Sequence, residues 1–124
     1  MRSVIGISVA GALGALARYG VDGVVSRASR GGFPWGTLLV NVSGAFLLGL
    51  IFTILAERFA VAPWIRSTIT IGFLGAYTTF STLALETVRL VQDGSYFLGL
   101  ANALGSIVVG VSALVLGVAL GRAI

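Results

Sequence analysis

Four apolar stretches, each long enough to cross a lipid bilayer, occupy almost the whole of this chain. They run from about 4 to 25, 36 to 56, 67 to 86 and 96 to 121. A helix needs roughly 20 predominantly apolar residues to span the hydrocarbon core of a bilayer, so only short polar loops are left over. The sequence therefore predicts an all-α integral membrane protein with a single domain of four transmembrane helices.

The composition excludes several classes of site. Of the 124 residues, 57% are hydrophobic, and only eight are basic and four acidic, which is far too apolar for a soluble domain of this size. The chain has no cysteine and no histidine, so it has no disulfide, no thiolate or imidazole metal site and no imidazole base. The net charge of +4 is small and scattered, which argues against a nucleic-acid partner. We expect no enzymatic activity and a function that lies within the membrane.

The third stretch has an unusual centre. The run from Gly72 to Thr82 contains two glycines and four Ser or Thr hydroxyls, where a span that only contacts lipid would carry Leu, Ile and Val. Irregular backbone at membrane depth is tolerated only where protein or a water-filled path covers it. We interpret this run as a broken helix with exposed carbonyls and hydroxyls. The alternative is a straight helix whose small residues allow close packing.

Three side chains on the spans each have more than one possible role. Asn41 either joins helices through a hydrogen bond, typically worth ~0.6 kcal/mol, or donates an amide N–H to a passing anion. Arg18 either reaches the headgroups, pairs with Asp22, or attracts anions to a water-filled vestibule. Phe80 either packs in the core or turns the positive edge of its ring towards a small anion.

The loop arginines give almost no bias in orientation. Four lie on the side of the termini and the middle loop and three on the other: Arg2, Arg58, Arg66 and Arg122 against Arg27, Arg30 and Arg89. Orientation normally follows an excess of Lys and Arg in the cytoplasmic loops, so a chain without that excess can insert both ways. Two opposite copies could then pair, and their breaks would meet at the midplane. Carbonyls from both chains would there suit a cation such as Na⁺. The alternative is a fixed orientation set by the positions of individual arginines.

Three segments resemble the Fluc/CrcB family of fluoride channels. They are Gly11–Tyr19, Gly36–Gly44 and Gly72–Glu86, which are similar to the first, second and broken third spans of that family. The resemblance covers the whole chain. It implies a dual-topology antiparallel dimer in the cell membrane whose two pores export fluoride passively. The second subunit would be another copy of the chain, or a paralogue in a heterodimer.

The resemblance also implies roles for individual residues. The backbone carbonyls of Gly75 and Thr78 would hold a structural Na⁺, and Arg18 would lie near a vestibule. The residues expected at the fluoride pore are Asn41, Phe80, Ser81, Thr82 and Ser112.

Two positions depart from the family pattern. The family usually has a second pore phenylalanine where this chain has Leu83, which cannot offer a positive ring edge. The fourth-span hydroxyl of the family matches Gly110 here, which leaves Ser106 or Ser112 as a substitute. Gly110 and Gly117, a heptad apart, predict close helix packing.

Two other functions remain as alternatives. A small proton-coupled multidrug exporter of four helices would need a membrane-embedded carboxylate. Asp22 lies too near the end of its span for this, which leaves only Glu86. A non-transporting assembly subunit would explain the glycines but not the clustered hydroxyls.

Overall fold

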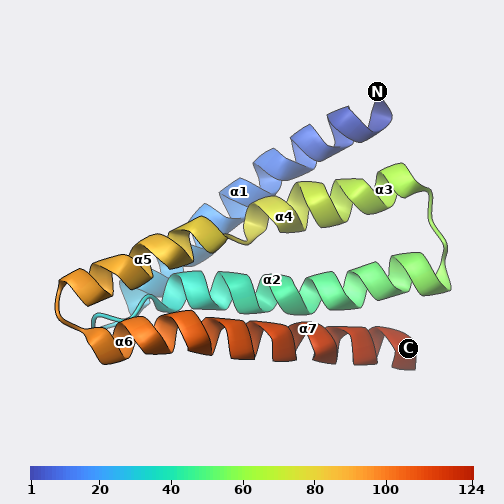
Figure 1. Cartoon of the computed structure of the whole chain (residues 1–124). Coiled ribbons are helices and arrows are strands. Elements are labelled where there is room, and N and C mark those ends of the chain that lie inside the picture. Colours follow the sequence, from blue (N-terminus) through green and yellow to red (C-terminus); the bar gives the residue numbers. More distant parts are fainter.

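The computed structural model covers residues 1–124 and is entirely helical (Figure 1). The first span is α1 (Arg2–Ala28), and the second is α2 (Trp35–Thr53) continued by the π-helical turn η1 (Ile54–Arg58). The third contains α3 (Pro63–Ser67), the π-helical η2 (Thr68–Leu74), α4 (Gly75–Tyr77) and α5 (Phe80–Gln92). The fourth contains α6 (Tyr96–Leu100), the π-helical η3 (Ala101–Gly105) and α7 (Ser106–Ala123). All four spans are long and apolar enough to cross a membrane, which confirms the prediction of an all-α, four-span chain.

The second and fourth spans form the closest helix pair. In Figure 1, α2 and α7 lie side by side and run in the same direction. A Cβ added at Gly117 would meet the carbonyl oxygen of Phe46, and one added at Gly49 would meet that of Leu114. Such close backbone approach is typical of membrane helices that pack through small residues. Gly110 has no neighbour within 4 Å of an added Cβ, so the predicted close packing at Gly110 is wrong.

The first span packs against the first half of the third. A Cβ at Gly14 would meet the carbonyl oxygen of Phe73, and one at Gly72 would meet the backbone of Ile7. The α1 helix and the α3–η2–α4 segment therefore approach through glycines, as α2 and α7 do. The second half of the third span, α5, lies beyond this contact and packs mainly against α6.

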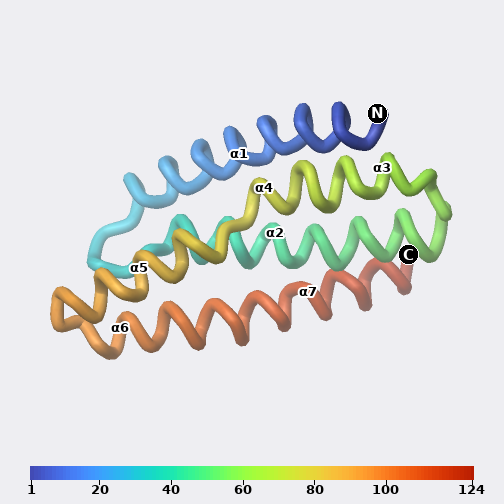
Figure 2. Tube along the Cα trace, turned by 45° about the horizontal axis from the view of Figure 1, so that its top comes forward, coloured from blue at the N-terminus to red at the C-terminus, as the bar shows by residue number.

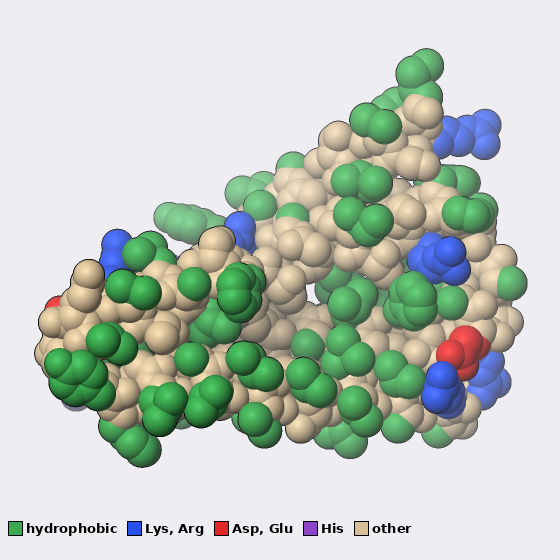
Figure 3. Space-filling view, in the orientation of Figure 1, with side chains coloured by type: hydrophobic (Ala, Val, Ile, Leu, Met, Phe, Trp, Pro, Cys, Tyr) green, Lys and Arg blue, Asp and Glu red, His purple; other side chains and the backbone are tan.

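Most of the apolar surface faces outwards. Only 18 of 124 residues are buried, and large hydrophobic side chains are exposed along all four spans. Figure 3 shows hydrophobic side chains over the whole visible face, with charged ones mostly towards the two ends. A soluble protein rarely exposes so much contiguous apolar surface. Together with the four spans, this surface describes a multi-pass membrane protein.

Both termini and the connection between the second and third spans lie at one end of the molecule (Figure 1). There, Arg122 donates from Nε and a terminal nitrogen to the two carboxylate oxygens of Glu57, at 3.1 and 3.0 Å. Arg58 donates to the backbone carbonyl of Arg122. These contacts join the end of the second span to the end of the fourth.

Candidate functional site

The third span leaves helical geometry at two residues. Thr78 (φ −83°, ψ 157°) and Thr79 (φ −150°, ψ 115°) are extended, between the end of α4 at Tyr77 and the start of α5 at Phe80. Figure 2 shows the chain running straight between the two helices. The Thr79 side chain caps α5, because its Oγ1 accepts from the backbone N–H of Thr82 at 3.2 Å.

Asn41 on α2 holds the backbone of this break. Its Nδ2 donates to the Thr79 carbonyl at 3.0 Å, and its Oδ1 accepts from the Thr79 N–H at 2.7 Å. One side chain thus bonds both backbone groups of an extended residue, and it is the partner of the Thr79 N–H, which unwound backbone within a membrane requires. The second proton on Nδ2 remains available to another acceptor. The amide therefore joins helices and can still donate a hydrogen bond.

The break frees several backbone carbonyls, among them those of Gly75 and Thr78. In a continuous helix each carbonyl accepts from the N–H four residues later. The donor for Gly75 would be the Thr79 N–H, which bonds Asn41 instead. The donor for Thr78 would be the Thr82 N–H, which bonds the Thr79 side chain instead. These two carbonyls are hard oxygen ligands of the kind that Na⁺ accepts.

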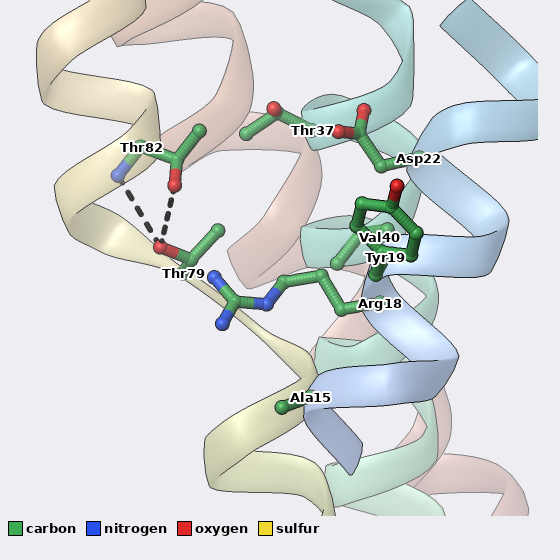
Figure 4. Close-up of a pocket in the computed structure, with 8 residues that line it drawn as sticks. All are labelled: Ala15, Arg18, Tyr19, Asp22, Thr37, Val40, Thr79 and Thr82. Carbon is green, nitrogen blue, oxygen red and sulfur yellow. Dashed lines mark hydrogen bonds between the residues drawn. The ribbon is translucent and has the colours of Figure 1, made fainter. Parts of the chain in front are cut away.

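The first of two cavities beside the break has a volume of about 300 Å³. Figure 4 shows its lining: Ala15, Arg18, Tyr19, Asp22, Thr37, Val40, Thr79 and Thr82. The Arg18 guanidinium extends across the cavity towards Thr79. It forms no ion pair with Asp22, since the only salt bridge of the chain joins Arg122 to Glu57. Asp22 instead accepts a hydrogen bond from Ser26 at 3.1 Å.

The second cavity lies on the other side of the break and has a volume of about 290 Å³. Its lining combines apolar residues of α2 and α7 with a set of residues around the break: Asn41, Gly75, Thr78, Thr79, Phe80, Leu83 and Ser106. Thr79 lines both cavities. The break is therefore the wall that separates them.

The polar groups at the break suit the binding of a small anion better than the chemical conversion of a substrate. The Thr79 hydroxyl donates to Thr82 Oγ1 at 3.0 Å, which leaves the Thr82 proton free to donate into the first cavity. Arg18 adds a permanent positive charge to the same space. No group of three or more acidic side chains could hold a metal ion, so any cation here would be held by backbone, hydroxyl or amide oxygens.

Comparison with known families agrees with this geometry. The model of a family described as "CrcB-like protein, Camphor Resistance (CrcB)" matches residues 5–118. The chain belongs to the CrcB-like family. The resemblance seen in the sequence is thereby confirmed over nearly the full chain.

Individual CrcB-like relatives match from end to end. A protein of Citrifermentans bemidjiense is 43% identical over 124 residues, which cover all of both chains. One of Magnetococcus marinus is 43% identical over 118 residues, covering 95% of this chain and 96% of the relative. One of Geobacter sulfurreducens is 45% identical over 107 residues, covering 86% of each. All three relatives are named "Fluoride-specific ion channel FluC".

The aromatic expected in the pore of this CrcB-like chain lies at its surface. Phe80 is 77% exposed and borders the second cavity, where Leu83 is buried beside it. Ser81 is exposed, with its hydroxyl 3.3 Å from that of Thr79. Leu83 thus fills apolar space at the position where the family usually has its second phenylalanine.

Of the two fourth-span hydroxyls, the structure brings only one to the break. Ser112 is exposed on α7, donates to the carbonyl of Val108 in its own helix, and lines neither cavity. Ser106 is 7% exposed, lines the second cavity, and its hydroxyl has no partner within the chain. Within a single chain, Ser106 and not Ser112 lines the second cavity together with Thr78 and Phe80.

Sequence reasoning missed a contact between α2 and α5. Thr37 donates to Glu86 Oε1 at 2.7 Å, and Glu86 forms no ion pair with Arg89. A signal was present, because Thr37 and Asn41 share a face of one helix while Thr79, Thr82 and Glu86 share a face of another. Only the packing of α2 on α5 shows that these two faces meet.

Proposed function

We propose that this chain forms a fluoride-selective channel that lets F⁻ leave the cytoplasm passively across the cell membrane. The observation that carries the proposal is the unwound backbone at Thr79, which Asn41 holds between two cavities. The names of the relatives, which match over 86 to 100% of this chain, support fluoride as the ion.

The direction of transport follows from the chemistry of hydrogen fluoride. HF is a weak neutral acid that crosses lipid and dissociates in a near-neutral cytoplasm, which traps F⁻ inside. An inside-negative potential drives an anion outwards by ~2.3 kcal/mol per charge per 100 mV. A passive anion path therefore lowers internal fluoride without an energy source, which would reduce its toxicity.

The active unit in this proposal is an antiparallel dimer of dual topology. The side chain of Phe80 and the residues Ser81 and Gly75 are exposed in one chain, on the segment that carries the break. A second chain inserted upside down would cover this segment with its own break. The nearly balanced arginines of the loops allow both insertions. The partner is a second copy of the chain or a paralogue.

A structural Na⁺ at the dimer centre is part of the same proposal. The carbonyls of Gly75 and Thr78, freed as described above, would face those of the partner across the twofold axis. Such a site needs no acidic side chain. A fixed positive charge there would also lower the cost of an anion nearby, since charge interactions are strong where water is scarce.

The proposed fluoride path begins in the first cavity and passes the break. Arg18 would attract F⁻ into the vestibule, and the hydroxyl of Thr82 and the free N–H of Asn41 would replace its water. Beyond the break, Phe80 and Ser81 would offer a ring edge and a hydroxyl. Ser112 could join such a path only from a face that a partner covers, whereas Ser106 is available within the chain.

The decisive experiment is ion efflux from liposomes that contain the purified protein. Vesicles loaded with KF or KCl are made permeable to K⁺ with valinomycin, and the released anion is recorded with an ion-selective electrode. We expect fast F⁻ efflux and much slower Cl⁻ efflux. Equal rates for both anions, or no efflux, would exclude a fluoride-selective channel. Proton-linked exchange of organic cations would support the multidrug exporter instead.

The absence of cysteine permits a clean test of dual topology. Gln92→Cys and Ala62→Cys place single thiols at exposed positions at opposite ends of the molecule. In cells, a membrane-impermeant maleimide should label about half of each variant if the chain inserts both ways. Full labelling of one variant and none of the other would establish a fixed orientation.

A further inference from the structure

One face of α5 passes from the packed interior to the edge of the second cavity. Phe80, Leu83, Thr87 and Leu90 are spaced by three or four residues and therefore lie along one stripe of the helix. Leu83 and Leu90 are each 8% exposed, whereas Phe80 is 77% exposed. The rotation of α5 about its own axis thus decides where the Phe80 ring points.

A polar contact at Thr87 joins this face of α5 to the fourth span. The Thr87 hydroxyl donates to the carbonyl of Leu83 at 2.8 Å, and a hydroxyl has only one proton to donate. It can therefore only accept from the amide of Asn102, whose Nδ2 lies 3.0 Å away on η3. The chemistry of Thr87 sets the orientation of the Asn102 amide without ambiguity.

Asn102 is completely buried, and the bond to Thr87 is the only hydrogen bond that its side chain makes. One turn further along the fourth span, Ser106 lines the second cavity beside Phe80 and Leu83. The contact between Asn102 and Thr87 therefore lies one helical turn away from Leu83 and Ser106, which line the cavity.

Two other polar contacts hold α5, and both come from α2. They join Thr37 to Glu86 and Asn41 to the backbone of Thr79. The bond from Asn102 is the only hydrogen bond between side chains of α5 and the fourth span. If it is removed, α5 stays attached on one side and loses its polar restraint on the other.

We propose that Asn102 is a positioning residue for ion conduction, which through Thr87 sets the rotation of α5 and so the direction of Phe80 at the cavity. This inference rests on the proposed function, because the process that it serves is fluoride conduction. Asn102 itself is buried away from the cavity and does not touch the ion.

The test compares Asn102→Leu and Thr87→Val with the conservative variant Thr87→Ser, which keeps the hydroxyl. Ser8→Ala is the matched control, since Ser8 is exposed and bonds only the Val4 carbonyl of its own helix. Each purified dimer is assayed for F⁻ and Cl⁻ efflux, normalised to monodisperse protein. We expect the first two variants to lose about tenfold in F⁻ rate and to show a lower F⁻/Cl⁻ ratio. Thr87→Ser and Ser8→Ala should match the wild type.

The double variant Asn102→Leu/Thr87→Val should be no slower than either single variant, because both remove the same bond. Unchanged rate and selectivity in folded Asn102→Leu would overturn the inference alone, provided that the wild type conducts F⁻. So would additive losses, or a Thr87→Ser variant as impaired as Thr87→Val. If Asn102→Leu does not fold, the comparison of Thr87→Val with Thr87→Ser decides. A wild type without F⁻ efflux would remove the proposed function and this inference together.

Discussion

Replacing Asn41 by leucine should convert the broken third span towards a continuous helix. Leucine has a similar size but neither the donor nor the acceptor that now bond the Thr79 backbone at 3.0 and 2.7 Å. In the broken form, the Thr79 N–H would then be unpaired, whereas the Thr79 carbonyl, as the N-cap of α5, still accepts from the N–H of Leu83. In a continuous helix, the Thr79 N–H would find the carbonyl of Gly75.

The size of the effect follows from that one group. An unpaired buried donor or acceptor costs about 1–3 kcal/mol, so the broken form loses about that much relative to the straight one. At 1.4 kcal/mol for each factor of ten, its population relative to the straight form falls by roughly fivefold to 150-fold. Fluoride efflux should fall by at least the lower figure.

Efflux from liposomes measures this prediction, and size-exclusion chromatography reports whether the protein remains folded. Asn41→Asp provides a second arm, since its carboxylate keeps an acceptor for the Thr79 N–H but places negative charge beside the Thr79 carbonyl. We expect it to abolish efflux as well, without unfolding the protein. Ser8→Ala serves again as the unaffected control. A folded Asn41→Leu protein that conducts F⁻ within twofold of the wild type would refute the role assigned to this amide.

Three further outcomes are expected. Phe80→Ile should abolish F⁻ efflux and leave the oligomeric state intact, because isoleucine keeps the position apolar but has no ring edge; an unchanged rate would take Phe80 out of the path. Gly117→Val should lower thermal stability strongly, because the valine side chain would meet the backbone of α2, whereas Gly110→Val should change the stability little. Equal effects of the two substitutions in a thermal unfolding assay would contradict the packing described here. Exchange of Na⁺ for N-methylglucamine throughout purification and assay should reduce efflux, and the rate should recover when Na⁺ is restored; identical rates in both cations would argue against the sodium site.

Sequence reasoning succeeded where a property belongs to a single helix. The number of spans follows from hydropathy and length, because the bilayer imposes both. The unusual run from Gly72 to Thr82 contains the residues at which the helix stops, Thr78 and Thr79. Glycines and hydroxyls weaken a helix locally, so this signal needs no knowledge of the neighbouring spans.

Sequence reasoning failed where a property depends on which faces of two helices meet. Ser106 and Ser112 are equally plausible hydroxyls in the sequence, but only the packing of the fourth span turns one of them to the break. The predicted packing at Gly110 was wrong for the same reason. Its heptad spacing from Gly117 does not show whether another helix lies close enough to contact it.

Hydropathy, span length and local helix propensity act within one segment, so the order of residues alone makes this chain a membrane protein of four helices with a weak point in the third. What stabilises that weak point depends on how the helices pack against one another. The partner of the Thr79 backbone is Asn41, 38 residues away, and that of Glu86 is Thr37, 49 residues away. Hydrogen bonds of this range depend on the rotation and depth of two packed helices, which are set by close contacts such as that of Gly44 on α2 with Thr78 and Tyr77, and not by the residues that form the bonds.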